Sequence, residues 1–90
     1  MPFRNFEEMG YSPVKLLATG EWAGVMNMIY TCGILVGLDE SGYKTRFCYE
    51  TRKEAEAALA QWDGNGDPPG NWIKQKGGIE RMNPNYKKGE

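Results

Sequence analysis

The sequence contains no histidine, and this absence removes the side chain that proteins use most often as a general base. A zinc site takes about four ligands, usually cysteine or histidine, so the 2 cysteines cannot complete one. Serine occurs only at Ser12 and Ser41, and neither a phosphate-binding loop nor a dinucleotide fingerprint is present. We therefore predict a protein that is not an enzyme and that uses no cofactor and no metal.

An excess of charge of either sign is also missing, as is a long apolar run. The 11 basic and 12 acidic residues give a net charge of -1, which predicts no general attraction to nucleic acid or to an anionic membrane. No apolar run reaches the roughly 20 residues that a transmembrane helix needs. Residues 1–12 lack the apolar centre of a signal peptide. These absences predict a cytoplasmic protein without a membrane partner.

Two stretches have the composition of β-strands, rich in β-branched and aromatic residues. Residues 25–38 (VMNMIYTCGILVGL) are predicted as one long strand whose even-numbered side chains, including Tyr30, face the core. Residues 43–50 (YKTRFCYE) alternate between an apolar face that includes Phe47 and a polar face. These stretches predict a β-hairpin with one face toward the core.

The register of this hairpin follows from the requirement that its two apolar faces coincide. Pairing Leu38 with Tyr43 meets this requirement and leaves residues 39–42 as the loop, where Gly42 can supply a positive φ. A slip of a single residue would turn the charged side chains into the core, so the register should be well specified. The same pairing sets Ile34 opposite Phe47 and Cys32 opposite Tyr49.

The two cysteines fall on opposite faces in this register. Cys32 points inward and Cys48 points outward, so a disulfide between them is not expected. We predict that both thiols are free and that Cys48, facing solvent, reacts before Cys32.

A helix should follow the hairpin. Thr51 and Glu54 have the spacing of a capping box, in which the threonine hydroxyl accepts a hydrogen bond from a free backbone N–H group. Gly64 is placed to end the helix. The apolar positions at helical spacing form one stripe that packs on the sheet, with Trp62 as its largest anchor: Ala55, Ala58, Leu59 and Trp62.

Shorter elements flank the hairpin and the helix. Residues 14–18 and residues 72–76 are predicted as short strands, and residues 63–70 as a loop rich in glycine, proline and aspartate. Together these patterns predict one small α+β domain over residues 1–78. It consists of a three-stranded antiparallel meander, one helix packed on one face of the sheet, and a further short strand after the helix.

The two ends of the sequence carry weaker signals. Phe3, Phe6 and Met9 have the spacing of one helical turn that could pack on the core. Residues 79–90 are polar, and we predict a loosely packed or disordered tail.

The outward sheet face is the surface that we single out for binding. It carries Lys44 and Arg46, with Arg52 just beyond, and the facing strand offers Ile29 and Leu35. The sequence has no second helix to cover this apolar patch with a basic edge, so we predict a contact surface for a protein, including a second copy of the chain.

Other readings of this surface stay open. It can be an ordinary solvated sheet face, because exposed apolar atoms are common on protein surfaces. It can bind nucleic acid through its basic residues, although the net charge of -1 does not favour this partner. If the sheet face is not the contact surface, residues 63–70 are the next candidate.

The hairpin and helix, GYKTRF followed by TRKEAEAALAQW, resemble the three-stranded DNA-binding domains of phage integrase arms and plant ethylene-response factors. The resemblance covers residues 25–62 and implies a sheet that lies in the major groove. This chain departs from it, because acidic residues outnumber basic ones and a further strand is expected after the helix.

A second resemblance covers more of the chain. The segments GLDESGYKTRFCYET, AALAQWDGNGDPPG and WIKQKG resemble those of small uncharacterised accessory proteins encoded in phages and prophages. It implies a role in host takeover or in inhibition of a defence complex, and it implies no known active residue. The leading prediction is thus a non-enzymatic protein-binding module of this type; the alternative is a nucleic-acid-binding domain that uses the outward sheet face.

Overall fold

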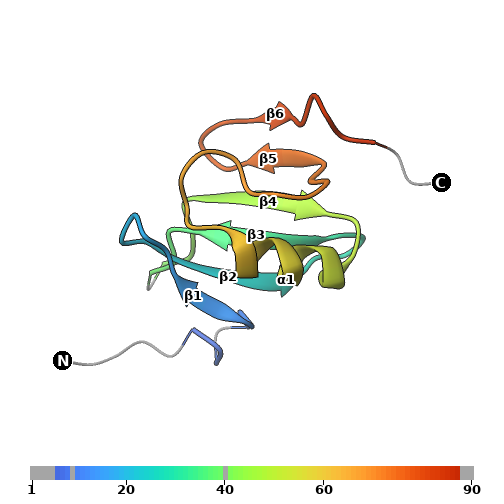
Figure 1. Ribbon diagram of the computed structural model, residues 1–90. Helices are drawn as coiled ribbons and strands as arrows, with labels where there is room; N and C mark the ends of the chain where they lie inside the picture. The colour runs from blue at the N-terminus through green and yellow to red at the C-terminus, as the bar shows by residue number, and fades with distance from the viewer. Residues whose placement is uncertain (1–5, 9, 40, 88–90) are drawn as a thin grey trace.

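The chain folds as an α+β domain in which one sheet carries a helix on one face (Figure 1). The computed structural model describes residues 6–8, 10–39 and 41–87. Over these residues, six strands pair antiparallel in chain order, and α1 lies between β4 and β5 in the sequence. The elements are β1 Val14–Leu16, β2 Trp22–Asn27, β3 Cys32–Val36, β4 Thr45–Tyr49, α1 Arg52–Gln61, β5 Lys74–Lys76 and β6 Arg81–Met82.

The hairpin of β3 and β4 has the predicted register. Ile34 pairs with Phe47 and Cys32 pairs with Tyr49. The bridge between Asp39 and Gly42 continues the same register into the loop. The strict alternation of residues 43–50 therefore sufficed to place the two strands against each other.

The prediction of one long strand over residues 25–38 is wrong. The backbone N–H of Met28 donates to the carbonyl of Thr31 at 2.7 Å, and the chain reverses there to form a hairpin of β2 and β3. The reversal changes the face of every side chain that precedes it, because Val25 now pairs with Ile34 and shares its face. Tyr30, predicted in the core, lies at the tip of the turn and is 92% exposed.

Helix α1 covers the face of the sheet that carries Ile34 and Phe47. Thr51 caps the helix, its hydroxyl accepting from the N–H of Glu54 at 3.2 Å, as the capping box predicts. The helix ends at Gln61, earlier than Gly64, and Trp62 is its C-terminal cap. The helix buries three of the four residues predicted for its stripe, and Trp62 is buried just beyond it: Ala55, Ala58, Leu59 and Trp62.

Three aromatic rings close this core. Phe47 meets Trp62 edge-on with ring centroids 5.7 Å apart, and it meets Trp72 in the same manner at 5.1 Å. Edge-to-face pairs of this kind add about 0.5–1.5 kcal/mol each beyond the area that they bury. Phe47 thus joins the end of α1 to the segment that leads into β5.

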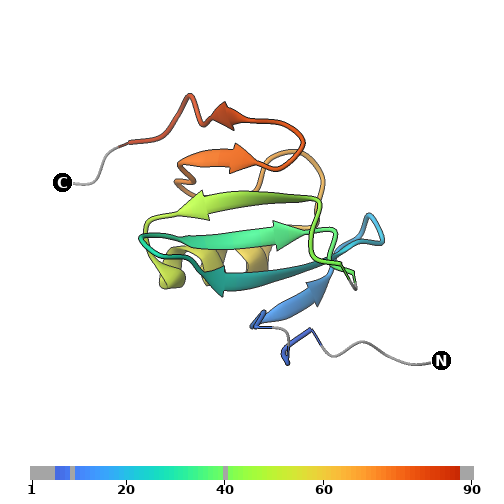
Figure 2. The same cartoon turned by 180° about the vertical axis from the view of Figure 1, so that it is seen from behind.

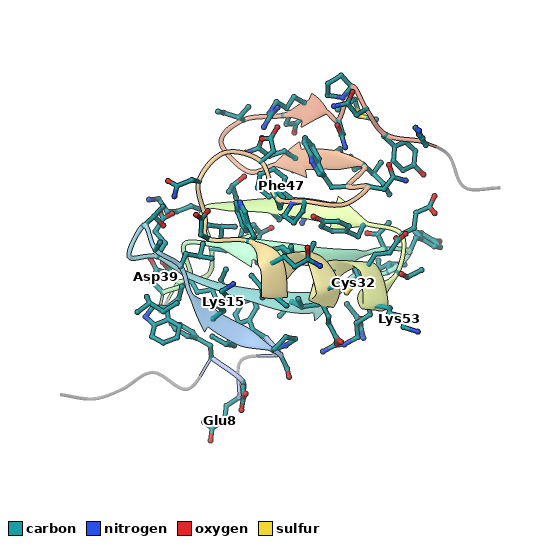
Figure 3. The ribbon with its side chains drawn as sticks, viewed as in Figure 1. Glu8, Lys15, Cys32, Asp39, Phe47 and Lys53 are labelled. Carbon is teal, nitrogen blue, oxygen red and sulfur yellow. The ribbon has the colours of Figure 1, made fainter. Side chains whose placement is uncertain are left out.

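A lysine of β1 holds the C-terminal end of α1. The Lys15 ammonium group donates to the carbonyls of Leu59 at 2.9 Å, Ala60 at 3.3 Å and Trp62 at 2.6 Å. Figure 3 shows Lys15 extending from β1 toward the end of the helix. The last turn of α1 has no basic residue of its own, so Lys15 supplies the positive charge that stabilises the free carbonyls there.

The opposite face of the sheet is partly covered, contrary to prediction. Phe6 and Tyr11 precede β1 and pack on Leu35 and Leu38, with four partly buried side chains around them: Val14, Trp22, Met26 and Met28. The burial of Phe6 fits the predicted apolar turn; Phe3 and Met9 of that turn lie outside the described residues.

The segment after the helix adds two strands to the sheet. A strand was predicted within residues 72–76, and β5 lies there; it pairs with β4 on one side and with β6 on the other. β6 falls within residues 79–90, where a loosely packed or disordered tail was expected. At Gly77 the backbone has a φ of +95°, and a Cβ would lie 2.7 Å from the carbonyl oxygen of Lys44, so only glycine fits this turn.

Candidate partner-binding site

The structure separates the five residues predicted for partner binding. Ile29 is 88% exposed at the tip of the β2–β3 turn, and Lys44 and Arg46 lie on the sheet face opposite α1. Leu35 is 1% exposed, so its prediction as a contact residue is wrong. The reason is that the N-terminal segment, which the sequence did not place over the sheet, packs on Leu35.

Two of the predicted cations already have partners within the chain. Lys44 forms an ion pair with Glu21 at 2.7 Å. Arg52 begins α1 and donates from Nε to Glu56, from Nη1 to Asn27 and from Nη2 to the carbonyl of Ser12. These bonds hold Arg52 at the junction of α1 with β2, so it is not brought together with Arg46.

A hollow lies on the sheet face away from the helix, next to the β2–β3 turn. Its volume is about 750 Å³, and its wall includes the whole turn, residues 27–31, together with Arg46, Cys48 and Lys74. We call this feature the basic hollow. In Figure 2 the sheet lies in front of α1, so that the face carrying the hollow is toward the viewer.

The positive charge at the hollow comes from two adjacent strands: Arg46 and Lys74 line it, and Lys76 lines the adjoining smaller depression. Arg46 of β4 pairs directly with Lys76 of β5, and Cys48 pairs with Lys74. Alternation along each strand places these side chains on one face. Within the described part of the chain, none of the three cations forms an ion pair.

Arg46 is only partly satisfied in its place. Its Nη1 donates to the Tyr43 hydroxyl at 3.0 Å. Its Nε is buried and has no hydrogen-bond partner among the described residues. A buried, unpaired donor costs about 1–3 kcal/mol, more when the group is charged, so Arg46 is held in its place at a cost in stability.

Apolar side chains border the hollow. Ile29 and Tyr30 project from the turn, and Met82 of β6, which pairs with Lys74 on the same face, is 63% exposed. A smaller depression of about 190 Å³ adjoins the hollow at Lys74 and extends to Met82. Sequence reasoning missed Tyr30 and Lys74 as members of this surface; the length of the predicted strand, about twice the usual 5–6 residues, was the signal that it contains a turn.

The two thiols are free and lie on opposite faces of the sheet, as predicted. Both are 2% exposed, so Cys48 faces away from the helix without reaching solvent. Cys32 makes weak hydrogen bonds to the Met26 carbonyl and to Asn27, each at 3.4 Å. Burial raises the pKa of the Cys32 thiol, while the positive charge of Arg52 opposes this shift.

Residues 63–70, the alternative contact surface, are tied into the domain. The Asp63 carboxylate accepts from the N–H of Asn65 at 2.9 Å, and Asp67 forms an ion pair with Arg81. The Arg81 guanidinium also lies over the Trp72 ring, 5.1 Å from its centroid. The charges of this loop thus have partners within the chain, whereas Arg46, Lys74 and Lys76 form no ion pair among the described residues.

The structure also bears on metals and membranes. Over the described residues, no three acidic or cysteine side chains gather in a way that could hold a metal ion. In the same part of the chain, no helix has the length and apolar character needed to cross a membrane.

Comparisons with protein-family models, with curated proteins and with solved structures each found no match.

Proposed function

We propose that the chain is a small non-enzymatic protein-binding module whose partner docks on the basic hollow, with Ile29 and Tyr30 as apolar anchors. One observation carries this proposal: two adjacent large apolar side chains, 88% and 92% exposed and thus the most exposed large hydrophobic residues of the described chain, stand beside a hollow. Exposed apolar residues gathered at a concave, polar-rimmed surface are typical of interaction sites.

The energetics of the turn support a role outside the domain. A turn of this kind needs no large side chain, and Tyr30 at 92% exposure stabilises the folded chain little. Burying an isoleucine side chain fully yields about 1.5–3 kcal/mol. Tyrosine is among the residues that contribute most to binding when an interface covers them. Burial of Ile29 and Tyr30 under a partner would therefore contribute favourable free energy to binding, which folding alone does not provide.

Nucleic acid is the alternative partner. It is favoured by three cations near an exposed tyrosine, the combination that binds single strands through phosphates and base stacking. The net charge of -1 opposes it, because the rest of the molecule would repel a long polyanion. The accessory role in a phage, including inhibition of a host or defence complex, is part of our proposal and rests on the sequence resemblance alone.

The test begins with a photo-crosslinking amino acid in place of Tyr30, and in a matched protein in place of Gln61, which is exposed on α1. The expected result is a protein captured from position 30 and not from position 61. That protein is then purified and titrated against variants of the chain. We expect Arg46→Glu to weaken its binding by about 1–3 kcal/mol, the range of a charge-assisted contact at an interface.

The controls separate docking from folding. Ile29→Asp should weaken the same complex while circular dichroism and the melting temperature stay close to those of the wild type, because the side chain is exposed. Gln61→Glu should bind as the wild type does. The proposal fails if Ile29→Asp and Arg46→Glu both bind the captured protein as tightly as the wild type.

A further inference from the structure

Arg46 and Lys76 form a cross-strand pair of like charge. They are direct partners in the β4–β5 ladder, and Lys74 lies two residues from Lys76 on the same strand and face. Side chains directly opposite in an antiparallel pair have Cβ atoms about 4.5–5.5 Å apart, and like charges at that distance destabilise the sheet. A fold under selection only for stability would place an acidic residue at one of these positions.

A lack of acidic residues does not explain this pair of like charges, because acidic residues compensate basic ones elsewhere in the chain. The other described basic residues of the sheet and of its helix junction have acceptors: Lys44 pairs with Glu21, Arg52 with Glu56, and Arg81 with Asp67. Glu80 lines the adjoining depression and forms no ion pair with Lys74 or Lys76. Among the described basic residues of the sheet, those left without an ion pair or a set of acceptor carbonyls are therefore Arg46, Lys74 and Lys76. Outside the sheet, Lys53 and Lys87 also form no ion pair among the described residues.

We propose that Arg46, Lys74 and Lys76 are a carboxylate-binding site that takes an extended acidic segment of a protein partner. This inference rests on the proposed function and deepens it by naming the chemistry of the partner. A carboxylate accepts two parallel bonds from a guanidinium, and Arg46, which forms no ion pair among the described residues, lines the hollow.

The spacing of the cations fits an extended chain. Alternate residues of a strand lie about 6.8 Å apart, which is also the separation of Lys74 and Lys76 along β5. Two glutamates at positions i and i+2 of an extended peptide therefore match these two lysines. The register sets Met82 beside Lys74, and the turn of residues 27–31 borders the hollow at Lys74 as well, so an apolar residue at the Lys74 end of such a peptide would reach this apolar wall.

Two other ligands, a second copy of the chain and a nucleic acid, fit the charge and the apolar wall of the hollow less well than an acidic peptide does. A second copy that docked through this same patch would bring its own uncompensated cations against these, and the like charges would repel. Nucleic acid would use the cations, but the aliphatic wall of Met28, Ile29 and Met82 offers it no stacking surface beyond Tyr30. An acidic peptide with apolar flanks uses both the charge and the wall.

The test uses a fluorescein-labelled probe peptide, Leu-Ser-Glu-Ser-Glu-Ser-Leu, titrated with the full chain and followed by fluorescence anisotropy. Its control replaces both glutamates by glutamine, which keeps size and removes charge. The expected result is that the glutamine peptide binds at least about tenfold more weakly, the effect of one lost charge-assisted bond. Oligothymidylate at equal concentration of charge should not displace the peptide.

Variants of the chain then locate the site. Lys76→Gln should weaken peptide binding about tenfold, whereas Lys53→Gln, a lysine exposed on α1, should leave it unchanged. Lys76→Glu should abolish binding and at the same time raise the melting temperature, because it turns the repulsion with Arg46 into attraction. If Lys76 had only a structural role, Lys76→Glu would not weaken peptide binding while it raised the melting temperature.

Three outcomes overturn this inference. They are equal binding of the glutamine peptide, equal effects of Lys76→Gln and Lys53→Gln, and displacement of the peptide by oligothymidylate. If the inference fails while the crosslink at position 30 still captures a protein that Ile29→Asp releases, the protein-binding function stands and the acidic partner does not. If both fail, the hollow is not a binding surface.

Discussion

Replacing Lys15 by methionine should destabilise the domain by about 1–3 kcal/mol. The figure combines hydrogen bonds to a charged donor, about 1.5–3 kcal/mol, with partial solvent exposure, which reduces them. Three carbonyls at the C-terminal end of α1 lose their donor, and the last turn has no basic residue to replace it. Methionine keeps most of the length and apolar stem of lysine, so the change removes the charge more than the packing.

Urea unfolding followed by tryptophan fluorescence measures this loss, since Trp62 and Trp72 leave the core on unfolding. In a domain of this size each kcal/mol lowers the melting temperature by about 4–8 °C. Lys53→Met is the matched control: its side chain is exposed on α1, and methionine has a similar helix propensity, so the change should stay within about 0.5 kcal/mol of zero. If Lys15→Met costs no more than Lys53→Met, water satisfies these carbonyls and the reasoning is refuted.

Three further predictions concern the core and the thiols. Trp62→Ala should cost about 3–5 kcal/mol, as for other buried large aromatics, and a cost under about 1 kcal/mol would mean that the ring contact with Phe47 contributes little. Cys32 and Cys48, both 2% exposed, should react with a thiol reagent at similar slow rates in the native state and quickly in urea; fast native labelling of Cys48 alone would restore the original expectation. Burial raises the pKa of Tyr49, so its contribution to stability is complete below about pH 10, its unfolded value, and is lost as the pH rises toward the folded value; Tyr49→Phe should flatten the alkaline fall in a series of melting temperatures.

The parts of the fold that could be predicted are those in which local pattern and burial agree. The charged residues of 43–50 all lie on one face, and a slip of one residue from the observed register would bury them. The cap at Thr51 and the buried Ala55, Ala58 and Leu59 follow from helical spacing in the same way. In these segments each local choice already suits the tertiary structure.

The main error in the predicted fold is the turn between Met28 and Thr31, which the sequence analysis placed inside one long strand. The sequence MNMIYT has neither glycine nor proline, and Asn27 is its one residue of a type common in turns, so the local signal for the reversal between Met28 and Thr31 is weak. Tertiary pairing of β2 with β3 selects it instead, and the strand before it changes face as a result. The burial of Leu35 could not be predicted for a related reason, because the segment that covers it packs through only a few scattered side chains.

The chain order of the strands also determines how the domain can open. β5 and β6 are the last two strands at one edge of the sheet, so they can separate from β4 as a unit while α1 and strands β2 to β4 keep their contacts. Such an opening moves Lys74 and Lys76 away from Arg46, and a ligand that contacts all three cations would hold the unit shut. At a hundred times its dissociation constant, that ligand would lower the open population by about 100-fold, and amide hydrogens of β5 that exchange through this opening would slow by the same factor. Partner binding could then be measured as a slower hydrogen exchange of the amide groups at this edge of the sheet.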